Sequence, residues 1–242
     1  MIPKVIHFMW FGENPLTPLA KECIESWGEL WAEFEIRRWD ETNFDVSLNQ
    51  YCRQAYDAKK WAFVSDYARI KVLSEYGGLY LDTDVRALKS LPENMLAATV
   101  LLGWEAVDRV STAFIGAEPH APLIDEMLAS YSDSAFVRED GSLDETTNVK
   151  RLSSILEGHG FLPDGTRQSI KGIEIYPSEY FSPRDWLTGK TNITENTCSV
   201  HLFDESWVGG KTKLKNSLMH LAGPTGVSFA KSVMSRLGGK EK

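Results

Sequence analysis

Two aspartates, Asp82 and Asp84, stand one residue apart at the end of the apolar run 79–81. Aspartate is a poor strand former, so a predicted strand that ends in two carboxylates points to a chemical role. Residues i and i+2 of a strand point to the same face, about 6–7 Å apart. Two carboxylates held that close are unfavourable unless a cation lies between them, and a divalent metal that bridges phosphates is the simplest cation. The spacing therefore predicts a metal site, with an acidic turn after an edge strand as the alternative.

The segment before this strand, residues 59–78, is predicted to be a helix that ends at Gly77-Gly78. Its apolar residues recur along one face, at Val64, Ala68, Val72 and Tyr76. Asp66 and Arg69 are three residues apart and share a helix face close to that apolar stripe. This position favours an ion pair directed toward the interior, with a solvated pair on the helix surface as the alternative.

The rest of the chain alternates between predicted strands and predicted helices. The strands are expected at 3–11, 34–40, 99–105, 111–117, 172–177 and 198–203, and the helices at 19–31, 47–57, 120–132 and 145–157. This alternation predicts an α/β fold with a mostly parallel central sheet flanked by helices. Ligands of such sheets gather at the carboxyl ends of the strands, where Asp82 and Asp84 stand. No linker divides the chain, so we expect a single domain over residues 1–225 and a separate tail over residues 226–242.

Composition narrows the class of protein. The 242 residues are 43% hydrophobic and 25% charged, which is typical of a soluble globular domain. Three widely spaced cysteines, Cys23, Cys52 and Cys198, give neither a disulfide framework nor metal-ligand spacing, so a reducing cytoplasm is the expected location. Residues 209–242 carry a net charge of +6 and the remainder −14, within a total of −8. An acidic body argues against a nucleic-acid binder.

The tail combines basic residues with an amphipathic pattern. Its apolar stripe consists of Val227, Ala230, Val233 (or Met234) and Leu237. Lys231 and Arg236 lie off this stripe, an arrangement that attracts anionic lipid. The tail therefore favours one of two arrangements: a helix that packs on the acidic body and neutralises part of its charge, or a peripheral contact with the cytoplasmic face of a membrane.

The segment "SDYARIKVLSEYGGLYLDTDV" closely resembles the DXD signature of glycosyltransferase family 32, whose members include capsular-polysaccharide transferases and mannosyltransferases. The opening "IPKVIHFMWFG" and the later "HLFDESW" are similar to that family as well. Two departures leave the acceptor open. Thr112 stands where the family usually has Asn, and "ETTNVK" stands where it has a Thr-Gly-Pro motif.

The resemblance implies a GT-A nucleotide-diphospho-sugar transferase fold and a role for each matching residue. Asp84 would bind Mn²⁺ or Mg²⁺ directly, and Asp82 would bind it through water or contact the ribose or sugar. His201 would be a further metal ligand, with a purely structural histidine as the alternative. Asp66 and Arg69 would hold the ribose, the donor sugar or the phosphate, and Tyr80 would point into the same site.

Three further residues would contact the nucleotide donor. Trp10 would stack on the base, although a core tryptophan is an equal reading of its position. Ser206 and Trp207 would donate hydrogen bonds to the diphosphate. Asp82, Asp84 and Arg69 would be the catalytic group, because the metal and the guanidinium stabilise the charge that develops on the leaving phosphate.

The implied activity is metal-dependent transfer of a sugar from a nucleotide-sugar donor, with retention at the anomeric carbon. A UDP-sugar is the favoured donor and GDP-mannose the alternative. A glycan or lipid-linked saccharide of surface polysaccharide synthesis is the expected acceptor. Two other functions stay open. A phosphatase of the haloacid-dehalogenase type has an Asp-x-Asp strand but Thr or Val where Arg86 stands, and a carbohydrate-binding module would need no catalysis.

Overall fold

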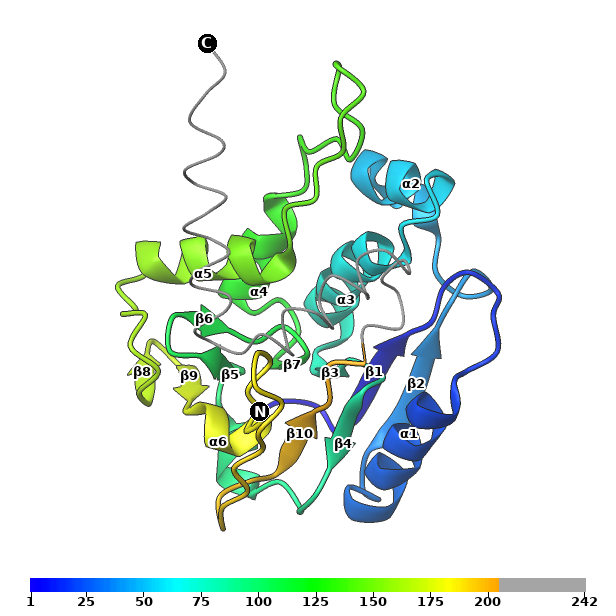
Figure 1. Cartoon of the computed structure of the whole chain (residues 1–242). Coiled ribbons are helices and arrows are strands. Elements are labelled where there is room, and N and C mark those ends of the chain that lie inside the picture. Colours follow the sequence, from blue (N-terminus) through cyan, green and yellow to red (C-terminus); the bar gives the residue numbers. More distant parts are fainter. Residues whose placement is uncertain (205–242) are drawn as a thin grey trace.

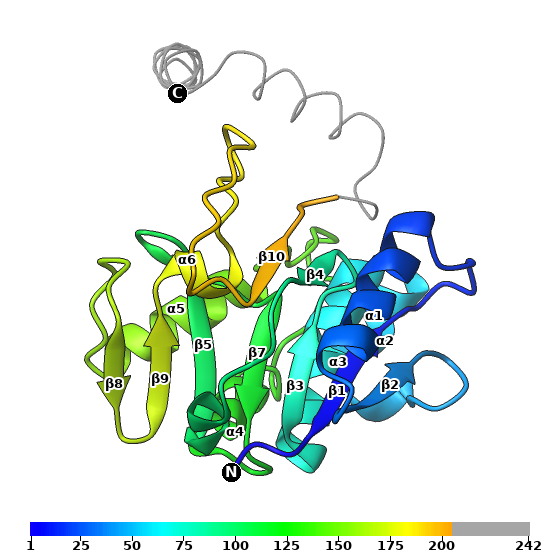
Figure 2. The same cartoon turned by 90° about the horizontal axis from the view of Figure 1, so that it is seen from below.

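A computed structural model describes residues 1–204 of the chain and shows a single central sheet of eight strands. The strands lie side by side from β8 at one edge to β2 at the other (Figures 1 and 2). In spatial order they are β2 (Glu35–Trp39), β1 (Val5–Met9), β3 (Gly78–Leu81), β7 (Phe114–Ala117), β5 (Val100–Ala106), β9 (Ile173–Tyr176) and β8 (Gln168–Ile170), and β6 (Arg109–Val110) pairs with β5. The pairings give β2, β1, β3, β5 and β9 one direction and β7, β8 and β6 the other. The predicted mostly parallel sheet is confirmed.

Both faces of the sheet are buried, which explains the nearly continuous apolar character of its central strands. In β3, Tyr80 belongs to the core on one face, while Leu79 and Leu81 belong to the core on the other. The helices are α1 (Pro18–Leu30), α2 (Gln50–Asp57), α3 (Trp61–Tyr76), α4 (Pro122–Ala129), α5 (Asn148–Gly158) and α6 (Ser178–Phe181), with short 3₁₀ turns at Val46–Leu48 and Glu93–Ala97. Helices α2 to α5 lie together on one side of the sheet, and α1 and α6 lie on the other (Figure 1).

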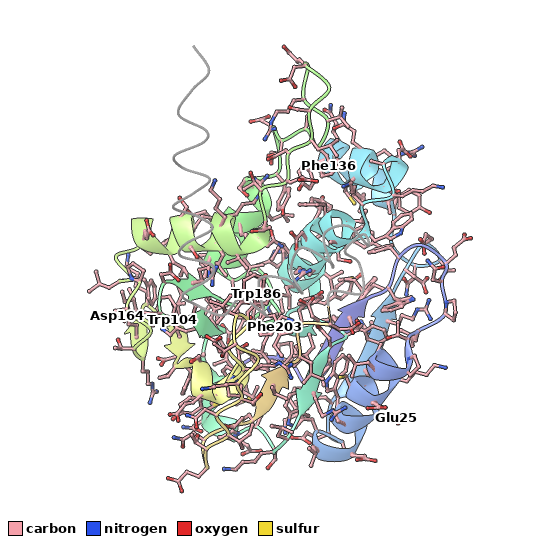
Figure 3. All side chains as sticks on the ribbon, viewed as in Figure 1. Glu25, Trp104, Phe136, Asp164, Trp186 and Phe203 are labelled. Atoms are coloured by element: carbon pink, nitrogen blue, oxygen red, sulfur yellow. The ribbon has the colours of Figure 1, made fainter. Side chains whose placement is uncertain are left out.

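Helix α3 is the central helix of its layer. Residues on several of its faces are buried, including the polar Asp66, Arg69 and Ser74, because α2 and α4 pack beside it and the sheet lies beneath it. The predicted single apolar stripe is therefore only part of the buried surface, and its last member, Tyr76, is 44% exposed. Phe136, labelled in Figure 3, is fully buried and packs on Phe63 of α3.

The turn between α3 and β3 is set by two glycines, as predicted. Gly77 and Gly78 have φ angles of +62° and +94°, which favour glycine, and the Gly77 N–H donates to the carbonyl of Leu73. A Cβ on Gly77 would lie 2.7 Å from the backbone nitrogen of Pro119. This tight turn fixes the direction of β3, and hence where the strand delivers its aspartates.

The expected geometry of the aspartate pair was wrong in one respect. Strand β3 ends at Leu81, and the chain turns over residues 82–84, where the Val85 N–H donates to the Asp82 carbonyl at 3.0 Å. It then enters β4 (Val85–Ala87), which pairs antiparallel with β10 (Ser199–His201) in a second, two-stranded sheet. A turn, and not the pleat of a strand, therefore sets the directions of the two carboxylates.

The remaining expectations differ in detail. The predicted strands and helices exist, most of them with shorter bounds and α1 and β5 shifted by one residue, while β4, β6, β8 and α6 were not predicted. Within residues 1–204, no helix has both the length and the apolar character needed to cross a lipid bilayer. The predicted tail, the last part of the predicted domain, Ser206 and Trp207 lie outside the described residues.

Candidate active site

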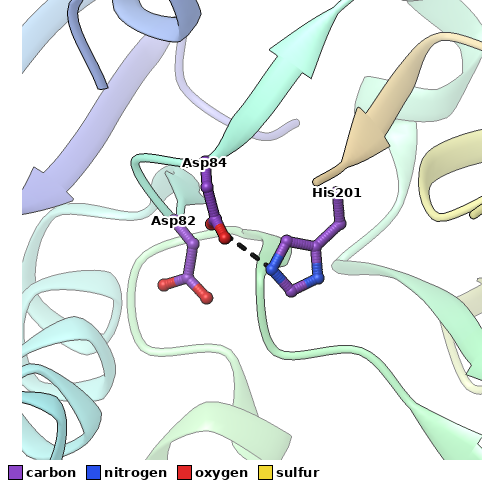
Figure 4. A group of neighbouring side chains, drawn as sticks. All are labelled: Asp82, Asp84 and His201. Atoms are coloured by element: carbon purple, nitrogen blue, oxygen red, sulfur yellow. Dashed lines mark ion pairs between the residues drawn. The ribbon is translucent and has the colours of Figure 1, made fainter. Parts of the chain in front are cut away.

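Asp82, Asp84 and His201 converge at the carboxyl edge of the sheet (Figure 4). Each of the three offers a ligand atom, and these atoms lie within 4.8 Å of one another. The β3–β4 turn supplies the two aspartates and β10 supplies the histidine, so a contact between residues far apart in sequence builds the group. Nε2 of His201 lies 3.3 Å from Oδ1 of Asp84, and the N–H of Asp204 donates to Oδ2 of Asp84 at 2.9 Å.

The charges of this group stabilise one another. Burial alone would raise the pKa of Asp84, but the charge and hydrogen bond of His201 and the Asp204 N–H outweigh it and lower that pKa. Burial would likewise lower the pKa of His201, but Asp84, Asp82 and Glu105 outweigh it and raise that pKa. Asp84 and His201 therefore each favour the charged form of the other.

A second group, formed by Asp66, Arg69 and Tyr80, adjoins Asp82. The Arg69 guanidinium lies between two carboxylates, with Nη2 3.1 Å from Oδ1 of Asp66 and Nη1 3.2 Å from Oδ1 of Asp82. It also donates to the carbonyl of Thr112 at 2.9 Å and lies 4.4 Å from the centre of the Tyr80 ring. The Tyr80 hydroxyl donates to Asp82 at 2.6 Å. Helix spacing predicted the Asp66–Arg69 pair, and the solvated alternative is wrong, because Arg69 is only 6% exposed.

Burial and the neighbouring charges together set the pKa values of this second group. Burial would lower the pKa of Arg69, but the charges of Asp82, Tyr80 and Asp66 outweigh burial and raise that pKa, so the guanidinium stays charged. Burial raises the pKa of Asp66, against the opposing effect of Arg69, and it raises the pKa of Tyr80 well above its usual range. Asp82 is the link between the two groups, since it contacts Arg69 and Tyr80 and also belongs to the cluster with Asp84 and His201.

Asn148 hydrogen-bonds to Asp66, whose other carboxylate oxygen faces Arg69, and this residue was not predicted from the sequence. It is the first residue of α5 and is 1% exposed. Its backbone N–H donates to Oδ2 of Asp66 at 3.3 Å, and its side-chain amide donates to the Asp66 carbonyl at 2.7 Å. The Tyr131 hydroxyl donates to the Asn148 side chain at 2.6 Å, which fixes the amide orientation. The one signal in the sequence was its place in "ETTNVK", the stretch that departs from the family pattern.

Glu105 is a second residue that sequence reasoning missed. It stands near the carboxyl end of β5, at the same edge of the sheet as the end of β3. Burial raises its pKa, while His201 and Arg109 lower it and the two aspartates raise it further. A charged residue at the end of the apolar strand 100–106 was the available signal, of the same kind as Asp82.

Trp10 follows β1 at this edge of the sheet and is half-buried. Its indole N–H donates to the carbonyl of Asn14 at 2.7 Å, and the ring packs on the edge of the core that contains Trp27. Stacking of Trp10 on the nucleotide base stays a prediction, since a half-buried ring contributes to the core and still presents a face.

The Asp82–Asp84–His201 group suits a divalent cation. Two carboxylates and an imidazole are a donor set that Mn²⁺ accepts, and the carboxylates alone suit Mg²⁺. Nε2 of His201 is the ring nitrogen that faces Asp84, while Nδ1 is buried and has no hydrogen-bond partner among residues 1–204. The residues present therefore fit a metal ion at this position.

Residues 17–101, which include both groups apart from His201, match the family described as "glycosyltransferase sugar-binding region containing DXD motif". The matched segment holds Asp66, Arg69, Tyr80, Asp82 and Asp84. Over 224 residues the chain is 26% identical to uncharacterized glycosyltransferase L373 of Acanthamoeba polyphaga mimivirus. This alignment covers 86% of this chain and 84% of the viral protein. Over 97 residues it is 32% identical to inositol phosphoceramide mannosyltransferase 3 of Schizosaccharomyces pombe, which covers 37% of this chain and only 26% of that protein.

Glycosyltransferase is therefore the enzyme class of this chain, and the phosphatase and carbohydrate-binding-module alternatives are set aside. Among solved structures, the PaToxG glycosyltransferase superposes with a TM-score of 0.50 at 16% identity, covering 65% of this chain and 68% of that chain. At this identity the likeness concerns the fold alone. The predicted GT-A fold is confirmed.

Proposed function

We propose that this DXD glycosyltransferase transfers a sugar from a nucleoside-diphosphate donor to a saccharide acceptor in a metal-dependent reaction. The observation that supports this best is the convergence of Asp82, Asp84 and His201 beside the buried Arg69. Mn²⁺ or Mg²⁺ at Asp84 and His201, with Asp82 as a direct or water-mediated ligand, would neutralise charge on the leaving diphosphate.

The side chains of the second group would act on the donor itself. Arg69 stays charged in a buried site, so it would stabilise negative charge on the departing phosphate more strongly than a solvated arginine. Asp66 would accept hydrogen bonds from hydroxyls of the donor sugar or ribose, and the Tyr80 hydroxyl would hold Asp82 in place. Trp10 would stack on the base, and Ser206 and Trp207 would donate hydrogen bonds to the diphosphate.

A UDP-sugar is the favoured donor. The similarity to two inositol phosphoceramide mannosyltransferases of Schizosaccharomyces pombe supports GDP-mannose as the alternative. We further propose a glycan or lipid-linked saccharide acceptor in surface polysaccharide synthesis, with retention at the anomeric carbon. The reaction would take place in the cytoplasm, with the basic tail over residues 226–242 in peripheral contact with the membrane.

Release of the nucleoside diphosphate from UDP- and GDP-sugars, with Mn²⁺ and with EDTA, tests this function. Asp84→Asn is expected to lower turnover by about 100-fold or more, because it removes an anionic ligand and a partner of His201. Asp57→Asn is the matched control, since Asp57 is an exposed aspartate on α2 whose partner is Arg53. Full activity in EDTA, or an Asp84→Asn variant as active as the control, would contradict the metal-dependent assignment.

A further inference from the structure

A cavity of about 470 Å³ lies beside the candidate active site, between the start of α5 and the β5–β6 hairpin. Its volume falls in the range of about 300–1,000 Å³ that is typical of small-molecule sites. Glu105 lines it from β5, and Thr147 and Lys150 line it from α5 and its N-cap. The cavity is not needed to explain donor binding, since Asp66, Arg69 and the metal group do not line it.

The cavity is connected to both groups of the active site. Thr147 immediately precedes Asn148, which holds Asp66. Glu105 lies at the sheet edge where β3 delivers Asp82, and its charge acts on His201. A ligand in the cavity would therefore lie next to the donor site.

A β-bulge directs Glu105 toward this cavity. The register between β5 and β6 shifts between Trp104, which pairs with Val110, and Ala106, which pairs with Arg109. Glu105 is therefore the extra residue in this strand. Bulges of this kind change the direction of a side chain and are frequent beside active sites.

Several groups on the cavity wall have unused hydrogen-bonding capacity. Within residues 1–204, neither the Glu105 carboxylate nor the Lys150 ammonium makes a side-chain hydrogen bond or an ion pair. The Ser153 hydroxyl is buried and has no partner there either, which is unfavourable unless a ligand or water satisfies it. A carboxylate, an ammonium and a hydroxyl on one wall can together donate to and accept from a ligand that carries several hydroxyls.

The charges on the wall select among classes of ligand. Three acids, Glu105, Asp108 and Glu157, outnumber the two bases, Arg109 and Lys150, so the wall disfavours a phosphate or other anion. Val149 is the single aliphatic residue on the described wall, so an apolar ligand is disfavoured as well. An uncharged, hydroxyl-rich molecule fits this composition best.

We propose that this cavity binds the terminal sugar of the saccharide acceptor, with Glu105, Lys150 and Ser153 as the groups that hold its hydroxyls. This assignment rests on the proposed sugar transfer and names the part of the molecule that selects the acceptor. Glu105 accepts a hydrogen bond from an acceptor hydroxyl at the side nearest the metal group. Lys150 and Ser153 hold the opposite side of the ring.

Two measurements on the full chain test the assignment. The first is release of nucleoside diphosphate from the donor in water with Mn²⁺, which reports on the donor site. The second is transfer to methyl glycosides of glucose, galactose, mannose and N-acetylglucosamine, supplied one at a time. Lys150→Met and Ser153→Ala are expected to lower the ratio of transfer to donor hydrolysis by about tenfold each, as loss of a hydrogen bond at a charged or buried group implies. Lys190→Met and Glu139→Gln, exposed residues away from the cavity, serve as controls and should leave the ratio unchanged.

The outcomes separate this assignment from the proposed function. If the wild type hydrolyses no donor, the proposed function fails. If it hydrolyses a donor but transfers to none of the four glycosides, or if the cavity variants transfer as well as the controls, the cavity is not the acceptor site. Inhibition of transfer by inorganic phosphate that Lys150→Met abolishes would identify an anion site, and would also overturn the assignment.

Discussion

Replacement of Arg69 by methionine tests the charge arrangement of the active site most directly. Arg69 is 6% exposed and contacts two carboxylates, Asp66 at 3.1 Å and Asp82 at 3.2 Å. Methionine retains most of the aliphatic stem but removes the cation, so it leaves two anions facing each other without compensation.

The expected cost follows from the burial of these partners. Removal of one partner from a buried ion pair typically costs about 3–5 kcal/mol. The Asp66 side chain is 12% exposed and that of Asp82 29%, so water can stabilise Asp82 in part and most of the loss should come from Asp66. A surface pair gives the contrast. Arg53 and Asp57 on α2 have side chains that are 56% and 58% exposed, and Arg53→Met should cost about 1 kcal/mol or less.

The loss should also depend on pH, in a direction that the structure fixes. Burial raises the pKa of Asp66 and Arg69 opposes that rise, so removing Arg69 raises this pKa further. When a carboxyl has a higher pKa in the folded state, the folded state binds more protons than the unfolded state between the two pKa values. Stability then falls as pH rises through that interval. The penalty of Arg69→Met is therefore largest at neutral pH and shrinks as the solution is acidified.

Urea unfolding at pH 7.5 and pH 5.5 measures both effects. The variants are Arg69→Met, Asp66→Asn, the double variant and the control Arg53→Met. The double variant should recover part of the loss, because it no longer buries an unpaired carboxylate, and it keeps the test informative if Arg69→Met does not fold at pH 7.5. The reasoning is refuted if Arg69→Met costs no more than the control, or if the double variant is no more stable than Arg69→Met.

Three further substitutions test other parts of the structure. Burial lowers the pKa of His7 to about 4, below its value of 6.5 when unfolded, so wild-type stability should fall by up to about 3 kcal/mol as pH drops from 6.5 to 4. His7→Gln should flatten this dependence in urea unfolding, and an unchanged slope would contradict it. Gly77→Ala should lower the melting temperature, because φ at this position is +62° and the added Cβ would collide with backbone atoms. Gly158→Ala is the control and should leave the melting temperature unchanged, because its added Cβ would have no atom within 4 Å. Trp10→Ala should raise the donor KM by about 5- to 100-fold and Trp10→Phe far less, as for a stacking contact worth about 1–3 kcal/mol. A lower melting temperature with an unchanged KM would instead show a core residue.

The fold was predictable because its signals are local. Alternation of strand and helix patterns predicted the mostly parallel sheet, and Gly77-Gly78 predicted the end of α3, where both residues do have positive φ. The short strand β4 was not predicted, since Val85 and Ala87 continue the chain from the DXD turn without a pattern of their own. Their strand conformation depends on pairing with β10, more than 110 positions later in the sequence.

The sequence predicted those site residues that lie close together along the chain. Helix spacing placed Asp66 and Arg69 together, and the short distance along the chain placed Asp82 near Asp84. Asn148 and Glu105 were missed because neither belongs to a local motif. Each reaches the site only through packing, Asn148 through the docking of α5 on α3 and Glu105 through the bulge in β5.

This difference between local and long-range contacts divides the active site into two parts. Arg69, Asp66 and Tyr80 lie on α3 and β3, which are joined by a tight glycine turn, so their geometry is set as soon as these elements pack. The metal group instead needs β10 to lie against β4, because His201 and the Asp204 N–H both contact Asp84 from that distant segment. A cation bound by Asp84 and His201 would connect the two segments directly. We therefore expect Mn²⁺ to stabilise the β4–β10 pairing more than the α3–β3 turn, since a ligand stabilises the contacts on which its site depends.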